Sequence, residues 1–159
     1  MEKTCCFTGH KPDKLAISNE ELEKKLRIAV NEAVNDGVTT FITGMAPGTD
    51  LIAGKVVLDL KNPDIKLICA VPFPNHSKPF SMQWKALYQK LLNNTTEAHY
   101  ICDKYSRVCF YRRDEWMVDH SNMVIAVYNG TRGGTRYTIN YAKKKGVPVK
   151  HVLDFTEKD

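Results

Sequence analysis

The sequence predicts one α/β domain built on an open, mostly parallel sheet of about six strands, with helices on both faces. Short runs of β-branched and apolar residues alternate with longer amphipathic runs, and this alternation is typical of repeated strand–helix units. The length of 159 residues fits a single domain with a substantial core. Glycine-containing turns follow several of the predicted strands and lead toward helices, as in a Rossmann-like fold.

The composition is that of a globular protein without a membrane segment. Hydrophobic residues make up 43% of the chain and charged residues 26%, a balance that disordered and fibrous proteins do not show. No stretch approaches the roughly 18 consecutive apolar residues of a membrane-spanning helix. Residues 1–7 lead directly into a strand-like run and lack the pattern of a signal peptide. We therefore expect a cytoplasmic protein.

The cysteines and the net charge say little about function. Five cysteines are an odd number, and their spacing matches no familiar zinc or redox signature. Cys102 and Cys109 are near enough in sequence to meet, but we expect reduced, structural cysteines, no metal and no cofactor. The net charge of +5 suits an anionic ligand or a nucleic acid. Because most basic residues are scattered, charge alone does not decide between these ligands.

Six short apolar runs predict the strands. They are Thr4–Phe7, Thr39–Thr43, Ile65–Val71, Ala98–Cys102, Met123–Tyr128 and Pro148–Val152. The longest non-periodic stretch, residues 72–79, follows the third of these runs and contains three prolines. A ligand-site loop lies at this place in an open α/β sheet.

Two helices are predicted between the first three strands. The first has a capping box, in which Ser18 stands three residues before Glu21, and it ends near Gly37. The second runs from about Asp50 to Leu60, with an apolar face for the core.

Three more helices are predicted in the second half. One carries an apolar stripe from Trp84 to Leu92. Residues 105–120 lack a clean stripe, yet we expect a helix there too. The last runs from residue 134 to residue 145, with Thr135 as its expected N-cap and Gly146 as its C-cap.

Three glycine-containing turns each follow a predicted strand, at residues 8–10, 44–50 and 129–135. All three fall on one edge of the sheet. Glycine lets backbone N–H groups approach a ligand, and a helix N-terminus carries partial positive charge, so phosphate is the expected guest. A single turn of this kind favours a purely geometric reason for the glycine, but three at one edge favour a ligand site.

Three segments resemble one family in their order and spacing. They are Cys5–Pro12, Gly44–Asp50, and Trp116–Ser121 followed by Gly133-Gly134-Thr135. On these residues the chain resembles the YpsA-like branch of the SLOG superfamily over nearly its whole length. That superfamily includes DNA-processing protein A and the Lonely Guy phosphoribohydrolases. The resemblance implies one Rossmann-like domain over residues 1–159 with a nucleotide pocket, and it leaves a homodimer open, but it does not supply the ligand.

The residues after the last glycine turn depart from the related hydrolases. Those enzymes carry an Arg-Lys pair before a methionine, and a catalytic glutamate after a Gly-Gly-x-Gly-Thr turn. Here Arg113 stands before Met117 in a similar place, but Asp114 replaces the lysine and Arg136-Tyr137 stand where the acid is expected. Cleavage of an N-glycosidic bond needs a carboxylate. We therefore expect no catalytic residue in this turn and favour a binding role.

Several candidate residues have structural alternatives. Asp50 is equally suited to cap a helix and to bind a ribose hydroxyl. Arg113 is interpreted as a phosphate contact in preference to a solvated helix charge. Asp119 is suited to tie a helix end to the sheet, and His10 to cap a turn. Asn129 and Asp50 are the two candidates for hydrogen bonding to the hydroxyl groups of the sugar.

The leading hypothesis is a domain that binds, senses or sequesters a nucleotide-type small molecule, NAD-derived, ADP-ribose-like or cyclic. The first alternative is a nucleotide N-glycosidase or phosphoribohydrolase whose acid comes from another position, such as Asp119. The second is single-stranded DNA binding, which the absence of a basic stripe interleaved with aromatics disfavours. The expected ligand-binding residues are Thr8, Gly9, His10, Gly44, Met45, Gly48, Asp50, Arg113, Asp119, Asn129, Gly133, Gly134 and Thr135.

Overall fold

The computed structural model describes residues 2–158 and contains a six-stranded sheet in which every neighbouring pair of strands is parallel. The strand order is β4-β3-β2-β1-β5-β6. The strands are β1 (Lys3–Gly9), β2 (Val38–Thr43), β3 (Lys66–Val71), β4 (Glu97–Tyr100), β5 (Met123–Val127) and β6 (Val149–His151). The six predicted strands and the Rossmann-like α/β class are therefore confirmed.

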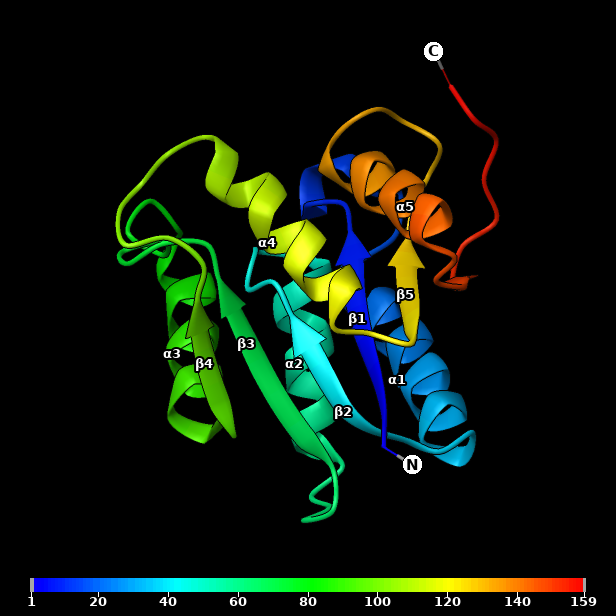
Figure 1. Cartoon of the computed structure of the whole chain (residues 1–159), viewed down its shortest axis with the longest axis horizontal. Helices are drawn as coiled ribbons and strands as arrows, with labels where there is room; N and C mark the ends of the chain where they lie inside the picture. The colour runs from blue at the N-terminus through cyan, green and yellow to red at the C-terminus, as the bar shows by residue number, and fades with distance from the viewer. Residues whose placement is uncertain (1, 159) are drawn as a thin grey trace.

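Helices cover both faces of the sheet, as predicted (Figure 1). Three of them pack side by side on one face, and α4 and α5 pack together on the other. They are α1 (Asn19–Asn35), α2 (Thr49–Asp59), α3 (Met82–Asn94), α4 (Val108–Asp119) and α5 (Gly134–Lys145), with a short 3-10 helix η1 (Pro12–Lys14) after β1. Within residues 2–158, none of the helices has the length and apolar composition of a membrane span.

Adjacent side chains of β1 point to opposite faces of the sheet, and each face is covered by helices. The strand is therefore buried on both sides. Cys5 and Phe7 belong to the core under α1, α2 and α3, whereas Cys6 packs with Met117 of α4 and Ala142 of α5. All three β1 residues are fully buried. The near-continuous apolar character of this strand follows from burial on both faces of a parallel sheet.

Helix ends follow the expected chemistry in α1 but not at the two helices beside the cleft. The Ser18 hydroxyl accepts a hydrogen bond from the Glu21 N–H (3.1 Å), so the predicted cap is confirmed. The N-cap of α5 is Gly133 instead of Thr135, and the N-cap of α2 is Gly48 instead of Asp50. Both glycines have positive φ, +93° at Gly48 and +145° at Gly133, so a side-chain cap is replaced by a backbone bend that favours glycine.

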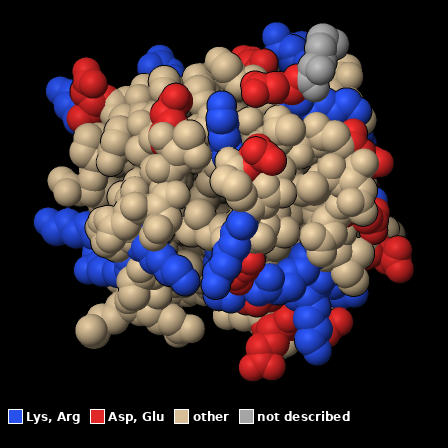
Figure 2. Space-filling model, turned by 90° about the horizontal axis from the view of Figure 1, so that it is seen from below, with Lys and Arg blue, Asp and Glu red and all other residues tan. Residues whose placement is uncertain are grey.

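The path of the chain creates a crevice between β1 and β5. From β1 the chain adds β2, β3 and β4 outward to one edge, and it then returns along α4 to place β5 on the other side of β1. Ligands of open α/β sheets bind where the direction of winding reverses, beyond the carboxyl ends of the strands. Figure 2 shows the opposite edge, where basic and acidic side chains lie intermixed around a largely uncharged surface.

Gly9→Ala should destabilise the fold, because Gly9 is where β1 meets the start of α2. A Cβ atom at this position would lie 2.2 Å from the Thr49 Oγ1 and 2.4 Å from its Cγ2. Thr49 is itself fully buried. Overpacking of this kind costs about 1–3 kcal/mol, so chemical denaturation should show a loss of about that size.

Gly134→Ala is the matched control. Its Cβ would lie 3.9 Å from the nearest atom, an Asp114 oxygen, and the position is helical. The free energy of unfolding of this variant should stay within about 0.5 kcal/mol of the parent or rise. Equal stability of the two variants would contradict the close packing of Gly9.

Candidate functional site

The turns after β1, β2 and β5 meet at the carboxyl edge of the sheet and line a cavity of about 250 Å³. The structure brings a large part of the predicted set to its wall: Thr8, Gly9, His10, Asp50, Arg113, Gly134 and Thr135. Lys11, Lys14, Ala46 and Asp114 also line the cavity. We refer to this cavity as the glycine-turn compartment.

The remaining glycine-turn residues shape the wall from behind. A Cβ at Gly44 would lie 2.9 Å from an Asp50 oxygen and 3.1 Å from the Arg113 Nε, so glycine here leaves room for that pair. Met45 is fully buried and has a positive φ of 69°, a strained conformation for a non-glycine residue. Gly48 and Gly133 begin the helices that face the cavity.

Asp119, one of the expected ligand-binding residues, does not line this cavity. Helix α4 begins at the carboxyl edge and must end at the amino edge, since the parallel strand β5 starts there. Asp119 is therefore roughly 9 Å further along the helix axis than Arg113. Its carboxylate is exposed and accepts a hydrogen bond from the Tyr141 hydroxyl (2.8 Å).

Asn129 supports the wall and does not line the cavity. Its side-chain amide donates to the Lys14 carbonyl (2.7 Å), and its oxygen accepts from the Thr131 N–H (3.0 Å) and the Thr131 hydroxyl (2.7 Å). These bonds tie the turn after β5 to η1. The structure therefore shows the Asn129 side chain, a candidate for contact with a sugar, bonded to these two turns.

Arg113 is buried and forms the centre of a charged cluster. Its Nη1 donates to the Gly44 carbonyl (2.9 Å), and its Nε donates to an Asp114 oxygen (3.1 Å), which lies 3.0 Å from Nη2. Its guanidinium also stacks over the Phe110 ring, with 5.7 Å between the carbon Cζ and the ring centroid. Only 9% of the residue is exposed. Arg113 lines the cavity, as expected of a ligand-binding residue, but its guanidinium is already bonded to Gly44 and Asp114.

Asp50 also interacts electrostatically with the Arg113 guanidinium. Its carboxylate accepts a weak hydrogen bond from the Ala46 N–H (3.3 Å). Burial raises the pKa of Asp50 to about 6, although Arg113 and the Ala46 N–H oppose the shift. Burial likewise raises the pKa of Asp114. The Arg113 guanidinium therefore faces the carboxylates of Asp50 and Asp114. The two carboxylates can accept hydrogen bonds from a ligand, and the cluster has no excess positive charge to attract an anion.

Positive charge gathers instead at the start of α5. Lys14 of η1 donates to the Arg132 carbonyl (3.2 Å), and its ammonium lies 3.1 Å from where a Cβ of Gly133 would be. The free N–H groups at this helix end add partial positive charge. Sequence reasoning missed Lys14, although its place in the turn after β1 was a usable signal.

A second, larger cavity of about 600 Å³ adjoins the first. The two share Lys11, Ala46, Arg113, Asp114 and Gly134 in their walls. The rest of the second wall is mainly aromatic and proline side chains, namely Phe73, His76, Pro79, Phe80, Tyr105, Phe110, Tyr111 and Pro47. We refer to it as the aromatic chamber. The expected ligand-site loop at residues 72–79 forms one side of it.

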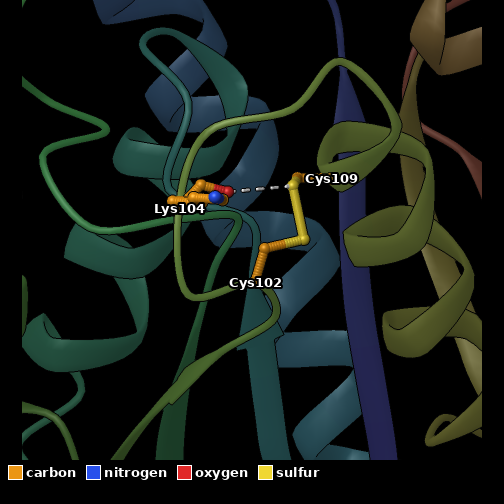
Figure 3. The surroundings of a disulfide bond; sticks show 3 residues. All are labelled: Cys102, Lys104 and Cys109. Atoms are coloured by element: carbon orange, nitrogen blue, oxygen red, sulfur yellow. Dashed lines mark hydrogen bonds between the residues drawn. A yellow bond between two sulfur atoms is a disulfide. The ribbon is translucent and has the colours of Figure 1, made fainter.

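The other side of the chamber is a loop closed by a disulfide between Cys102 and Cys109 (Figure 3), with the two Cα atoms 6.1 Å apart. This corrects the expectation that all cysteines are reduced, while Cys5, Cys6 and Cys69 are free and buried. The Cys109 sulfur also lies 3.6 Å from the Lys104 carbonyl oxygen. The pair meets because α4 begins only at Val108, three residues later than predicted, so the chain turns back over the end of β4.

Among residues 2–158, no group of three or more His, Cys, Asp or Glu side chains is placed to hold a metal ion.

Comparison with known proteins identifies the family. Residues 5–155 match YpsA, described as the YspA SLOG family. The chain belongs to this SLOG family. The SPbeta prophage-derived protein YoqJ of Bacillus subtilis (strain 168) is 37% identical to it over 139 residues, which cover 78% of this chain and 81% of that protein. A UPF0398 protein of Staphylococcus haemolyticus is 24% identical over 143 residues, or 84% of this chain and 76% of its own length.

Solved structures show the same fold for this SLOG protein. DNA processing protein A from Helicobacter pylori, described in a study of its single-stranded DNA binding, superposes with a TM-score of 0.67 at 19% identity. The same protein from Streptococcus pneumoniae gives a TM-score of 0.66 at 16% identity. Both matches cover 94% of this chain, which spans 64% and 50% of the two neighbours. At these identities the likeness establishes the fold.

Asp50→Asn should change how stability depends on pH. The pKa of Asp50 is about 6 in the folded protein, above its ordinary value of 3.8, so the folded state binds the proton more tightly than the unfolded state. The parent protein should therefore lose up to about 3 kcal/mol from this group as the pH rises from 4 to above 6. Asparagine does not titrate, so the variant lacks this loss.

Denaturation of both proteins at pH 4 and pH 7 measures the difference. We expect the stability of Asp50→Asn relative to the parent to be higher at pH 7 than at pH 4. Asp119→Asn, which removes an exposed carboxylate outside the cavity, is the matched comparison. A constant difference between Asp50→Asn and the parent across this range would contradict the buried, proton-retaining carboxyl.

Proposed function

We propose that this SLOG protein binds a nucleotide-type small molecule in the cleft at the carboxyl ends of β1, β2 and β5. The proposal rests on one observation: the glycine-turn compartment has a positively charged wall on one side and a wall with buried carboxylates on the other. The start of α5 with Lys14 is an anion site, and the facing Asp50 and Asp114 are buried hydrogen-bond acceptors. A phosphate joined to a sugar satisfies both surfaces at once.

In this proposal the phosphate lies against Gly133, Gly134 and Thr135, and the sugar hydroxyls donate to Asp50 and Asp114. Arg113 acts as a positioning residue that bonds to the Asp114 carboxylate and attracts that of Asp50. The ligand classes that fit are NAD-derived molecules, ADP-ribose-like molecules and cyclic nucleotides, which the protein senses or sequesters. A homodimer and a location in the cytoplasm remain part of the proposal.

The two residues beyond the last glycine turn do not supply a catalytic acid to the compartment. Arg136 donates to the Tyr128 hydroxyl (2.7 Å) and pairs with Glu157 (2.9 Å), and Tyr137 donates to Glu115. Neither side chain lines the glycine-turn compartment. The hydrolase alternative therefore needs Asp50 or Asp114 as its acid, and Asp119 is too far along α4 to serve.

Single-stranded DNA binding is the second candidate, favoured by the fold shared with DNA processing protein A. A protein that neutralises several phosphates loses affinity steeply as salt rises. Fluorescence anisotropy with a single-stranded oligonucleotide at 50 and 200 mM salt tests this role. We expect weak, non-specific association, and tight binding at the higher salt would favour the DNA role.

Lys14→Gln should weaken the binding of ADP-ribose, measured by calorimetry and by the rise in melting temperature that a ligand of the folded state produces. Loss of one charged contact to phosphate should lower affinity roughly tenfold. The matched control is Lys24→Gln, because Lys24 is an exposed lysine of α1 away from the cleft. It should bind like the parent.

Two results would remove the proposal. One is the absence of any binding heat with a panel of ADP-ribose, mononucleotides and cyclic dinucleotides. The other is release of free base from AMP by the purified protein, followed by chromatography and abolished in Asp114→Asn, which would make the protein an enzyme.

A further inference from the structure

The aromatic chamber is the larger part of the cleft, and the phosphate and sugar contacts proposed above do not use it. Its rings pack edge to face around Phe73, which lies 5.1 Å from Tyr105, 5.5 Å from Phe110 and 5.5 Å from His76 between ring centroids. Phe73 and His76 are buried, whereas Tyr105 is 61% exposed and Tyr111 49% exposed. The chamber thus has a fixed aromatic floor and an open aromatic rim.

Tyr105 is held at this rim by a short covalent loop. The disulfide between Cys102 and Cys109 closes the segment that carries it, and its ring packs roughly perpendicular to that of Phe73, at an interplanar angle of 83°. An aromatic ring that is mostly exposed and restrained in position is a surface for stacking a flat partner.

His76 supplies a polar group inside the chamber wall. It is 5% exposed, and its Nδ1 lies 3.4 Å from the Tyr88 hydroxyl. No hydrogen bond to its Nε2 is formed by the described residues. Burial, with Arg113 and Lys11 nearby, lowers the pKa of His76 to about 3, so the ring is neutral. A neutral imidazole has one donor and one acceptor nitrogen.

We propose that the aromatic chamber binds the nucleobase of the ligand, with Tyr105 stacking on the base and His76 hydrogen-bonding to its polar edge. This inference rests on the proposed function, since the base is attached to the sugar and phosphate in the adjoining compartment. Ala46, Arg113 and Gly134 lie in the walls of both cavities, so the two cavities are next to each other.

A nucleobase fits this chamber better than a purely apolar group. The walls combine aromatic rings with the polar groups of His76, Arg107 and Lys11, and an apolar ligand would bury these groups without hydrogen-bond partners. A base offers both a flat ring and donors and acceptors on its rim. The volume of about 600 Å³ lies within the range of small-molecule sites.

Calorimetry with ADP-ribose and ribose 5-phosphate tests this assignment on the parent, Tyr105→Ala and Tyr100→Ala. Tyr105→Ala should lower the affinity for ADP-ribose roughly tenfold, the effect of losing one base-stacking ring. It should leave ribose 5-phosphate unchanged, because that probe has no base. Tyr100 is also an exposed tyrosine, 49% accessible on β4, and does not line the chamber, so its variant should bind both probes like the parent.

Failure of the chamber and failure of the phosphate site give different results. Equal affinity of the parent for both probes, or no effect of Tyr105→Ala on ADP-ribose, overturns the base assignment even when Lys14→Gln weakens both probes. An effect of Tyr105→Ala without an effect of Lys14→Gln supports the chamber and removes the phosphate site.

A third probe, a single-stranded oligothymidine, tests whether the bound base belongs to a small molecule or to a nucleic acid. Oligonucleotide binding that depends on Tyr105, with no binding of ADP-ribose, would overturn the small-molecule assignment in favour of nucleic acid. Absence of binding by all three probes would overturn the chamber and the proposed function together.

Discussion

A guanidinium that is shielded from water joins the parts of this molecule that form the cleft. Arg113 comes from α4, bonds to the carbonyl at the end of β2, pairs with its neighbour Asp114, and lies in the field of Asp50 at the start of α2. Removing one partner of a buried pair leaves an uncompensated charge, which is strongly unfavourable. The cluster therefore fixes the position of α4 relative to the start of α2 and the end of β2, at the place where a ligand would enter.

The polarity of the cleft follows from that cluster. The charge of Arg113 is balanced by Asp114, and its guanidinium also bonds to the Gly44 carbonyl. An anion is therefore attracted mainly by Lys14 and by the first turn of α5. Phe110, stacked on the guanidinium, marks the boundary between the polar and the aromatic sides. A molecule with a charged end, a hydroxylated middle and a flat end matches this order of surfaces.

The sequence predicts the fold well because its signals are local. Apolar runs mark each strand, and the Ser18 cap and Gly146 mark helix ends that the structure contains. The site was predicted less completely. That Arg113 is buried, and that Asp119 lies at the far end of its helix, depends on how α4 crosses the sheet. The aromatic chamber gathers residues from three separate segments, which no single stretch of sequence reveals.

The central place of β1 has a consequence for how the chain reaches its native state. Residues of this strand pair with β2 on one side and with β5, more than a hundred residues later, on the other, as Cys5 does with Phe41 and Met123. During synthesis on the ribosome, β1 to β4 can assemble early, but one edge of β1 stays open until β5 emerges. Contacts so distant in sequence form slowly, and an unpaired strand edge is prone to aggregation. The nascent chain is thus most vulnerable in the interval before residues 123–127 close the sheet.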